Sequence, residues 1–357
     1  MSVCFPRRRF SPERGFTLIE LLVAVVVLAL VMVGVLNMLD ASSRVSKVES
    51  ALVDTQENVR YAAYHLTRTV RMAGGAGLPF ARDDGGGAAW VMGRVDSNTA
   101  TVASPWTSDP TGAAGSDSLT LYGFFERNPF FVDAGEDVSG SVVTIRESVN
   151  RFDGIPASGA FENRGMVWVS HEVLTLVAVG QVAGGGGALS GTAPDRTLTL
   201  TAEAAGGVWA PLNPSGTAFP PVWARGPSRI GILDAYTYWV SPDHTLWRRR
   251  SSGDALGYTD EPVAVNIGSL QVALGIDSDD DGVVDVWNDS PTAANAADPN
   301  RPVAMRITVL GRTPFPVPNW AEPVATFNVE DMTLSGVDRA AKWRRMQVVA
   351  AMRNFMG

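Results

Sequence analysis

The sequence from Arg14 to Leu39 reads RGFTLIELLVAVVVLALVMVGVLNML and decides how the chain begins. After Glu20 it continues for 19 residues, from Leu21 to Leu39, without an ionisable side chain. At a rise of 1.5 Å per residue, a helix of that length spans about 28 Å, close to the hydrocarbon thickness of a bilayer. The segment therefore predicts one helix long enough to cross a membrane.

The charges around this apolar run indicate its orientation. The first 15 residues carry a net charge of +3, and they contain Cys4, the one cysteine of the chain. Because positive residues favour the cytoplasmic side, we expect a cytoplasmic N-terminus and a head exported to the periplasm. A single cysteine excludes an internal disulfide and a cysteine-based metal site.

Two ordinary membrane signals are alternatives for this segment. A secretory signal peptide has an apolar region of about 7–15 residues and a small-x-small cleavage site. The run here is longer, and no convincing site of that kind follows Leu39. A plain membrane anchor accounts for the length but not for Glu20, since a carboxylate in a membrane helix is costly and is usually functional.

The string Arg14-Gly15-Phe16-Thr17-Leu18-Ile19-Glu20 resembles the class III signal of type IV prepilins and pseudopilins. The resemblance implies cleavage by a prepilin peptidase after Gly15 and N-methylation of Phe16. It also implies that Glu20 pairs with the N-terminal amine of a neighbouring subunit in the filament, because a partner charge offsets the cost of a buried carboxylate. Losing a leader of net charge +3 changes the formal charge from -8 to -11.

The helical pattern continues beyond the apolar run to about Ala73, where a segment rich in glycine begins. Apolar residues recur at spacings of three and four, which predicts a stripe that packs on a globular head. These residues are Val45, Val48, Leu52, Val59, Ala62, Leu66 and Val70. We therefore expect a leader at 1–15, a membrane or filament-core half-helix at 16–39, an amphipathic half-helix at 40–73 and a β-rich head at 74–357.

The head is predicted to consist of many short strands. The chain is 45% hydrophobic and has 36 glycines and 22 prolines, which favours a β-rich body with many loops. The expected strands are Ser118–Phe125, Ser141–Glu147, Met166–Ser170, Val173–Val179, Thr197–Ala202, Ile230–Val240, Thr245–Arg250, Gly268–Gly275 and Val303–Leu310. A hairpin turn is expected at Ser241–His244.

The end of the chain suits a helix by composition, but the family resemblance below favours a strand from Arg345. The predicted class is α+β, of the type IV pilin-like kind.

An acidic stretch in the head has the spacing of a calcium loop. Residues 276–285 read IDSDDDGVVD, which matches the first nine ligand-loop positions of the DxDxDG pattern. Ca²⁺ takes six to eight oxygen ligands, and alternating carboxylates point inward when the chain curls around the ion. The expected ligands are Asp277, Asp279, Asp281, the carbonyl oxygen of Val283, Asp285 and Asn288.

One position departs from that pattern. The twelfth position, where an EF-hand has a bidentate glutamate, is Asn288. The preceding residues favour a strand over a helix, so a helix–loop–helix unit is not expected. The alternative interpretation is an acidic hairpin turn in water, where salt screens the repulsion between carboxylates. No other cofactor is expected.

Within the prepilins, the chain resembles the PilW type of minor pilin. The resemblance is carried by Gln56–Gly74, by Gly115–Thr120, by Tyr238–Arg248, by Leu270–Asp277 and by Arg353-Asn354. It implies a low-abundance subunit that primes, assembles or caps a filament. Its implied partners are other major and minor pilins, the prepilin peptidase and the inner-membrane assembly machinery, and its implied destination is a pilus at the cell surface.

Two other functions share the same N-terminus. One is a J-type minor pseudopilin of a type II secretion system, which the length of the head disfavours. The other is a pilus-tip adhesin that binds carbohydrate through exposed tryptophans such as Trp90, Trp106, Trp209 or Trp223. Tryptophans scattered through a β-rich head more often belong to its core.

Composition and motifs disfavour enzymes and nucleic-acid binding. His65, His171 and His244 are far apart in the sequence, and no His-Glu-x-x-His or Gly-x-Ser-x-Gly motif occurs. The acidic balance, with a pI near 5.0, is unlike the basic surplus of a nucleic-acid-binding domain. We therefore expect a protein that acts by assembly.

Overall fold

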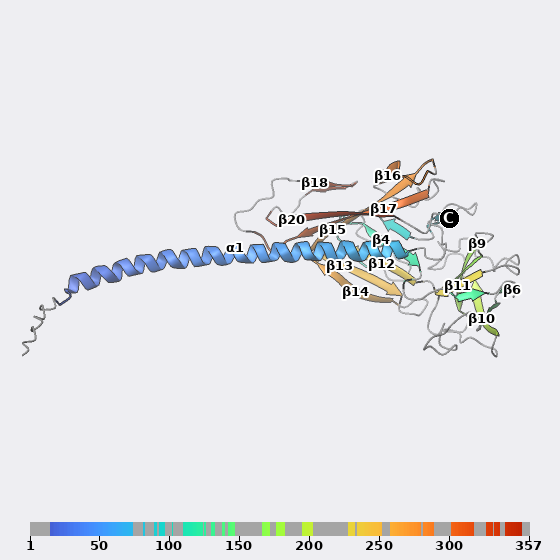
Figure 1. The fold of residues 1–357 in the computed structure, drawn as a ribbon, viewed down its shortest axis with the longest axis horizontal. Coiled ribbons are helices and arrows are strands. Elements are labelled where there is room, and N and C mark those ends of the chain that lie inside the picture. Colours follow the sequence, from blue (N-terminus) through green and yellow to red (C-terminus); the bar gives the residue numbers. More distant parts are fainter. Residues whose placement is uncertain are drawn as a thin grey trace, which may run out of the picture. The chain divides into compact units, whose positions relative to one another are not determined.

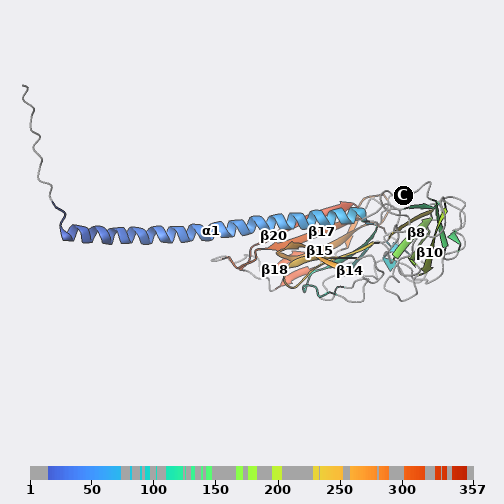
Figure 2. The same cartoon turned by 90° about the horizontal axis from the view of Figure 1, so that it is seen from below.

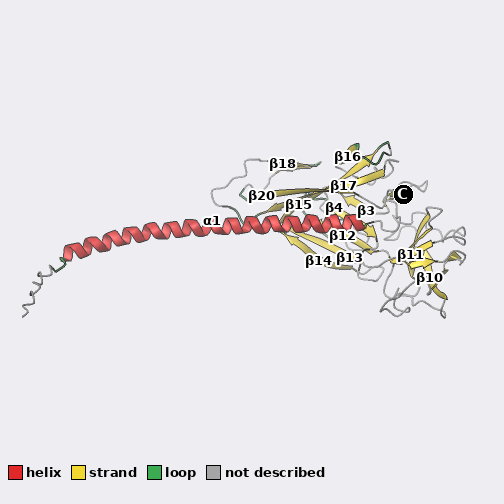
Figure 3. Ribbon diagram, viewed as in Figure 1, coloured by secondary structure: helices red, strands yellow, loops and turns green. Residues whose placement is uncertain are grey.

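A long helix leads into a β-rich head in the computed structural model of the chain (Figures 1 and 3). The structure describes residues 15–73, 81–82, 89–90, 93–96, 102, 110–123, 125, 130–132, 138–139, 142–146, 166–171, 176–182, 195–202, 228–232, 234–251, 258–279, 281–288, 301–317, 326–330, 332–335 and 340–351. The helix, α1, extends from Leu18 to Met72. This arrangement confirms the predicted α+β, pilin-like fold class.

The chain divides into two compact units, Met1–Val53 and Asp54–Gly357, so the division falls inside α1. In the first unit, every residue of α1 from Leu18 to Leu39 is exposed. In the second unit, α1 has a buried face made of small and apolar residues: Thr55, Val59, Ala62, Ala63, Leu66, Thr67, Thr69 and Val70. The second unit therefore includes the part of the helix that supports the head.

The predicted stripe is correct over only part of its length. Val59, Ala62, Leu66 and Val70 are buried as expected. Val45 is instead 57% exposed, and Val48 and Leu52 are only half-buried. These three residues precede Asp54, where the second unit begins, whereas the four buried residues belong to the second unit.

The described strands form three larger sheets and two hairpins, with antiparallel pairing throughout. The five-stranded sheet has the order β14 (Tyr258–Val265), β13 (Thr245–Ser251), β12 (Asp234–Val240), β4 (Ser118–Gly123) and β3 (Gly93–Asp96). The four-stranded sheet has the order β16 (Val286–Asn288), β15 (Ile267–Asp277), β17 (Arg301–Arg312) and β20 (Trp343–Ala351).

The seven-stranded sheet has the order β5 (Phe130–Val132), β11 (Ser228–Ile232), β8 (Met166–His171), β9 (Leu176–Val182), β10 (Asp195–Ala202), β7 (Val142–Arg146) and β6 (Val138–Ser139). The two hairpins are β1 (Ala81–Arg82) with β2 (Ala89–Trp90), and β18 (Thr326–Val329) with β19 (Met332–Ser335).

One core joins the helix to two of these sheets. Leu66 and Val70 of α1 are buried in the same cluster as Tyr238 of β12, Val272 of β15 and Ile307 of β17. Figure 2 shows the end of α1 running beside β15, β17 and β20. The close approach depends on Gly311 of β17, because a Cβ atom there would lie 2.3 Å from Cγ2 of Val59.

A polar segment before β4 connects the five-stranded and four-stranded sheets. Gly115 has φ of +74°, which glycine adopts without strain, and the chain then lies along the edge of β15. The Ser116 hydroxyl accepts the N–H of Leu270 at 3.0 Å, and the buried Asp117 carboxylate accepts the N–H of Val272 at 2.7 Å. These bonds satisfy backbone donors of β15 that a strand partner would otherwise take.

Most of the predicted strands are present, with one wrong assignment. Ile230–Val240 was expected to be one strand, but β11 and β12 belong to different sheets. β11 pairs with β5 and β8, whereas β12 pairs with β4 and β13, so partner strands rather than local sequence separate them. The hairpin turn at Ser241–His244 and the C-terminal strand, β20, are confirmed.

Candidate functional site

The predicted cleavage junction immediately precedes the helix. Gly15 and Phe16 are exposed and lie before α1, which begins at Leu18. Nothing lies within 4 Å of the position that a Cβ atom on Gly15 would occupy, so the backbone at this residue is open. An open, non-helical backbone suits a peptidase, which must hold the chain extended to cut it.

Glu20 has a partner within its own chain. Its Oε2 accepts the backbone N–H of Thr17 at 2.9 Å and the Thr17 hydroxyl at 2.9 Å. The Thr17 hydroxyl oxygen in turn accepts the N–H of Glu20 at 3.3 Å. This reciprocal arrangement is a capping box, which satisfies free N–H groups at the start of a helix. The sequence analysis missed it, although a threonine three residues before a glutamate is its signature.

The first unit presents an apolar helical surface. Leu22, Leu28 and Leu36 of α1 are 56%, 62% and 60% exposed. In the described part of the chain, α1 is by length and composition a helix that could cross a membrane. An apolar helix with no polar face requires apolar surroundings, either lipid or other helices.

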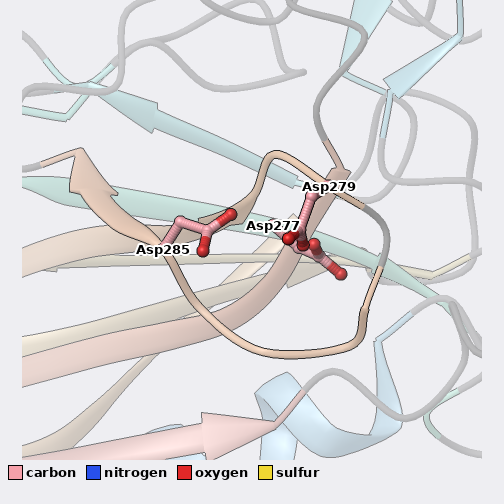
Figure 4. Close-up of side chains that lie close together, drawn as sticks. All are labelled: Asp277, Asp279 and Asp285. Carbon is pink, nitrogen blue, oxygen red and sulfur yellow. The ribbon is translucent and has the colours of Figure 1, made fainter.

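The acidic stretch connects β15 to β16 in a hairpin, and Figure 4 shows three of its carboxylates. Ligand oxygens of Asp277, Asp279 and Asp285 lie within 4.8 Å of one another. Two Ca–O bonds of 2.3–2.6 Å bridge oxygens up to about 5.2 Å apart, so each pair of these oxygens is close enough to share an ion. Asp285 lies across the loop from the other two (Figure 4).

The loop is curled by its own hydrogen bonds. The buried Asp277 carboxylate accepts the N–H of Gly282 at 2.7 Å and that of Asp281 at 3.2 Å. Gly282 has φ of +84°, the left-handed conformation that the pattern requires there. On the other side of the loop, Ser278 donates its N–H to Asp285 at 2.8 Å. The sequence analysis did not identify Ser278 as a residue that holds a ligand in place.

The remaining predicted ligands lie differently. Asp281 is outside the group of three, and its carboxylate accepts the N–H of Val283 at 2.7 Å. The charge of Asp281 is the main reason that the pKa of Asp279 is raised. Val283 is exposed, and Asn288 is half-buried in β16 opposite Leu274. The structure thus brings together three of the predicted carboxylates, and the metal assignment stays a prediction.

The histidines have separate structural surroundings. The His65 ring lies 3.2 Å from the Tyr238 hydroxyl at Nδ1, whereas His244 Nε2 lies 2.9 Å from Nη1 of Arg312. His171 is the last residue of β8. Among the described side chains, His65 and His244 belong to no group of potential metal ligands. Of the tryptophans considered for ligand binding, Trp106, Trp209 and Trp223 and the side chain of Trp90 lie outside the described parts.

Two family models match the chain. The model of the prokaryotic N-terminal methylation motif matches residues 11–36, and that of type IV pilus-assembly protein W, PilW, matches residues 235–354. The second match covers β12 to β20 and includes the acidic loop. No curated protein and no solved structure matches the chain. Gln56–Gly74 and Gly115–Thr120, which carried part of the resemblance, lie outside both matched ranges.

The matches agree with the geometry at both ends of the chain. The methylation motif covers the open junction at Gly15, the capping box and the exposed apolar helix. The PilW match covers most of the strands that form the head's core with α1, and β3 and β4 lie outside it. Both families are pilin structural and assembly families rather than enzyme families. The matches support membrane anchoring through the helix and association with other pilins, and over the matched residues the chain is similar to PilW-type prepilins.

Proposed function

We propose that this chain is a minor pilin that helps to prime, assemble or cap a type IV pilus. The observation that carries the proposal is the presence, on one chain, of a methylation motif at 11–36 and a PilW match at 235–354. An exposed apolar helix supplies a part that can pack into a filament, and a large head supplies a part that can select partners. The protein acts by packing, with no chemistry of its own.

Processing and location follow from the same proposal. A prepilin peptidase cleaves after Gly15, and Phe16 is N-methylated. Before assembly, the helix crosses the inner membrane once with its N-terminus in the cytoplasm and its head in the periplasm. The inner-membrane machinery then delivers the chain to a pilus on the cell surface. The exposed junction at Gly15 and the apolar surface of α1 support this order of events.

Mass spectrometry of sheared, purified surface filaments tests the proposal. We expect a methylated peptide that begins at Phe16, at trace abundance beside a major pilin. If surface filaments lack the chain and the mature peptide occurs only in membranes, the better assignment is a J-type pseudopilin of a type II secretion system or a priming subunit that stays at the base. Binding of the intact protein to a glycan array would instead add a tip-adhesin role.

We also propose that the loop between β15 and β16 binds Ca²⁺. The proximity of Asp277, Asp279 and Asp285 supports this, as does the curled backbone around Gly282. If only the folded chain binds Ca²⁺, a Ca²⁺ concentration of 100 times the dissociation constant raises the free energy of unfolding by about 2.7 kcal/mol. For a chain of this size, that corresponds to a rise in melting temperature on the order of 5 °C.

Thermal unfolding of the full-length protein in detergent, with 5 mM Ca²⁺ or with a chelator, measures this effect. Asp279→Asn should remove the calcium-dependent rise, because Asp279 is an exposed member of the group. Asp243→Asn is the control, since Asp243 is an exposed aspartate in another hairpin turn. An identical melting temperature in calcium and chelator would show that the loop is an ordinary acidic turn.

A further inference from the structure

The side of α1 opposite its buried face carries an unusual set of residues in the second unit. Its members recur at spacings of three and four, which places them on one face of the helix. We call this set the basic–aromatic stripe, and it consists of Glu57, Arg60, Tyr61, Tyr64, Arg68 and Arg71. All six residues are exposed. The face that they form has no cover from the described part of the chain.

The stripe has the composition of a protein interface. Tyr61 is 53% exposed and Tyr64 is 67% exposed, although each ring offers a large apolar area. Tyrosine and arginine are enriched at protein interfaces and at the residues that dominate binding energy, whereas lysine and glutamate are depleted. The stripe contains three arginines and no lysine. A helix face that only solvates the protein has no need of two exposed aromatic rings.

The charge of the stripe is opposite to that of the rest of the molecule. Three arginines against Glu57 give it a net charge of +2, in a chain whose formal charge is -8. Among the described residues, Arg60, Arg68 and Arg71 form no ion pair, whereas Arg248, Arg249 and Arg250 are all paired with carboxylates. The guanidinium groups of the stripe are therefore available. Their planar forks match carboxylates.

A lipid headgroup does not fit this position. Arg60 follows Leu39, the last residue of the apolar run, by about six turns of α1, or about 32 Å of helical rise. The headgroup region on each side of a bilayer is only about 5–8 Å thick. The stripe instead belongs to α1, the same helix whose beginning matches the methylation motif.

From the exposure, composition and charge of this face, we infer that the basic–aromatic stripe docks on an acidic surface of another pilin-like subunit. The inference rests on the proposed function and names the chemistry of the partner. The tyrosine rings supply buried area, and the arginine forks bind carboxylates of the partner. Because the partner's charge is opposite, the contact should weaken as salt is raised.

Photo-crosslinking in the native host tests the inference with the full-length chain. A p-benzoyl-phenylalanine replaces Tyr64, which is the most exposed ring of the stripe, and the same probe replaces Val265 as a control. Val265 is 50% exposed and lies on β14 rather than on α1. We expect the Tyr64 probe, and not the Val265 probe, to form a crosslink to another subunit that carries a methylation motif, with the crosslinked peptide rich in Asp or Glu.

Charge reversal gives a second measurement. Arg68→Glu, combined with the Tyr64 probe, should reduce the crosslinked fraction at least tenfold, whereas Arg68→Lys should reduce it less. Arg344→Glu on β20 is the matched control, because Arg344 is also an exposed arginine. An unchanged melting temperature of the Arg68→Glu variant shows that the loss is not due to misfolding.

The outcomes separate this inference from the proposed function. If mass spectrometry finds the chain with pilins in sheared filaments but the Tyr64 probe forms no crosslink to a pilin, the inference is wrong and the proposed function stands. A Tyr64 crosslink only to a second copy of this chain, or only to phospholipid, also overturns the inference. If the chain is absent from every fraction that contains pilins, both fail together.

Discussion

Leu18–Leu39 and Asp54–Met72 are parts of one helix, yet their side chains meet opposite conditions. In the first part every residue is exposed, and Leu28 is 62% exposed. In the second part exposed and buried residues alternate with the helical period, and Leu66 is fully buried. The sequences differ accordingly, because the first part has apolar residues on all sides and the second has them on one side.

The difference shows which contacts the chain provides for itself. Burying one Leu or Val side chain stabilises a protein by about 1.5–3 kcal/mol. The amphipathic part of α1 gains this stabilisation by packing on the strands of its own head. The first part can bury its apolar side chains only in lipid or against other subunits.

The largest expected effect is on assembly, at Glu20. Glu20→Ala removes both the capping box and the charge, and we expect incorporation into filaments to fall at least tenfold. Glu20→Gln separates the two roles, because glutamine can retain a capping box but carries no charge. Quantitative mass spectrometry of sheared filaments, with membrane levels of the chain as the control, measures both variants. Normal incorporation of Glu20→Gln would show that helix capping, not charge pairing, is the role of this residue.

The next effect is on the stability of the head. Leu66→Ala should lower the free energy of unfolding by about 2–5 kcal/mol, since it leaves a cavity in the shared core. Leu28→Ala changes the same residue type in the exposed part of the same helix, and we expect it to leave the unfolding of the head unchanged. Tryptophan fluorescence during thermal unfolding in detergent reports on the head, because all ten tryptophans follow residue 74. Equal effects of the two variants would contradict the division between the two parts.

The sequence predicts the ends of α1 well, because strong local signals mark them. A charge-free run follows Glu20, and a glycine-rich segment follows Ala73. Periodicity alone did not show where the buried stripe begins. Val45 continues the pattern but is exposed, because a three- and four-residue spacing identifies a face without identifying what covers it.

The candidate sites show the same limit. The spacing of the acidic loop was sufficient to predict that Asp277, Asp279 and Asp285 come together. It was insufficient to predict that Asp281 turns to the N–H of Val283 instead. Likewise, most residues of Ile230–Val240 favour strands, and the partner strands show that the segment forms two strands. That division depends on contacts between segments that are distant in the sequence, which local patterns do not encode, whereas Asp281 bonds a residue only two positions away.

A smaller loss of stability is expected at Gly311, where the helix lies closest to β17. A Cβ atom at this position would be 2.3 Å from Cγ2 of Val59 and 2.9 Å from Cγ2 of Thr55. Gly311→Ala should therefore lower the free energy of unfolding by about 1–3 kcal/mol through overpacking. Combining it with Val59→Ala should restore part of that loss, because the nearest clashing methyl group is removed.

The matched control for this variant is Gly34→Ala. No atom lies within 4 Å of a Cβ built on Gly34, and alanine favours a helix more than glycine does. We expect no loss of stability from it in thermal unfolding of the detergent-solubilised chain. A Gly311→Ala variant as stable as the wild type would mean that α1 can move away from β17 without loss of core contacts.

The smallest expected effect is a dependence of head stability on pH through His65. Burial, followed by the charges of Arg248 and Arg68, lowers the pKa of His65 to about 4, while Glu261 raises it. The unfolded chain has a histidine pKa near 6.5, so below that pH the unfolded state binds the proton more readily. The contribution of neutral His65 is therefore complete above about pH 6.5 and is lost as the pH falls toward 4.

The full shift in the pKa of His65 corresponds to about 3 kcal/mol of folding stability. Because the ring is partly exposed, solvent screening reduces this contribution to on the order of 1–2 kcal/mol. Other groups also titrate in this range, so the informative quantity is a difference between variants. Urea unfolding of the wild type and of His65→Gln at pH 7.5 and pH 5 measures it. The wild type should lose more stability than the variant, because glutamine cannot take up the proton. Equal losses would mean that His65 remains accessible to protons in the folded head, and that the contact between α1 and Tyr238 is looser than the 3.2 Å separation indicates.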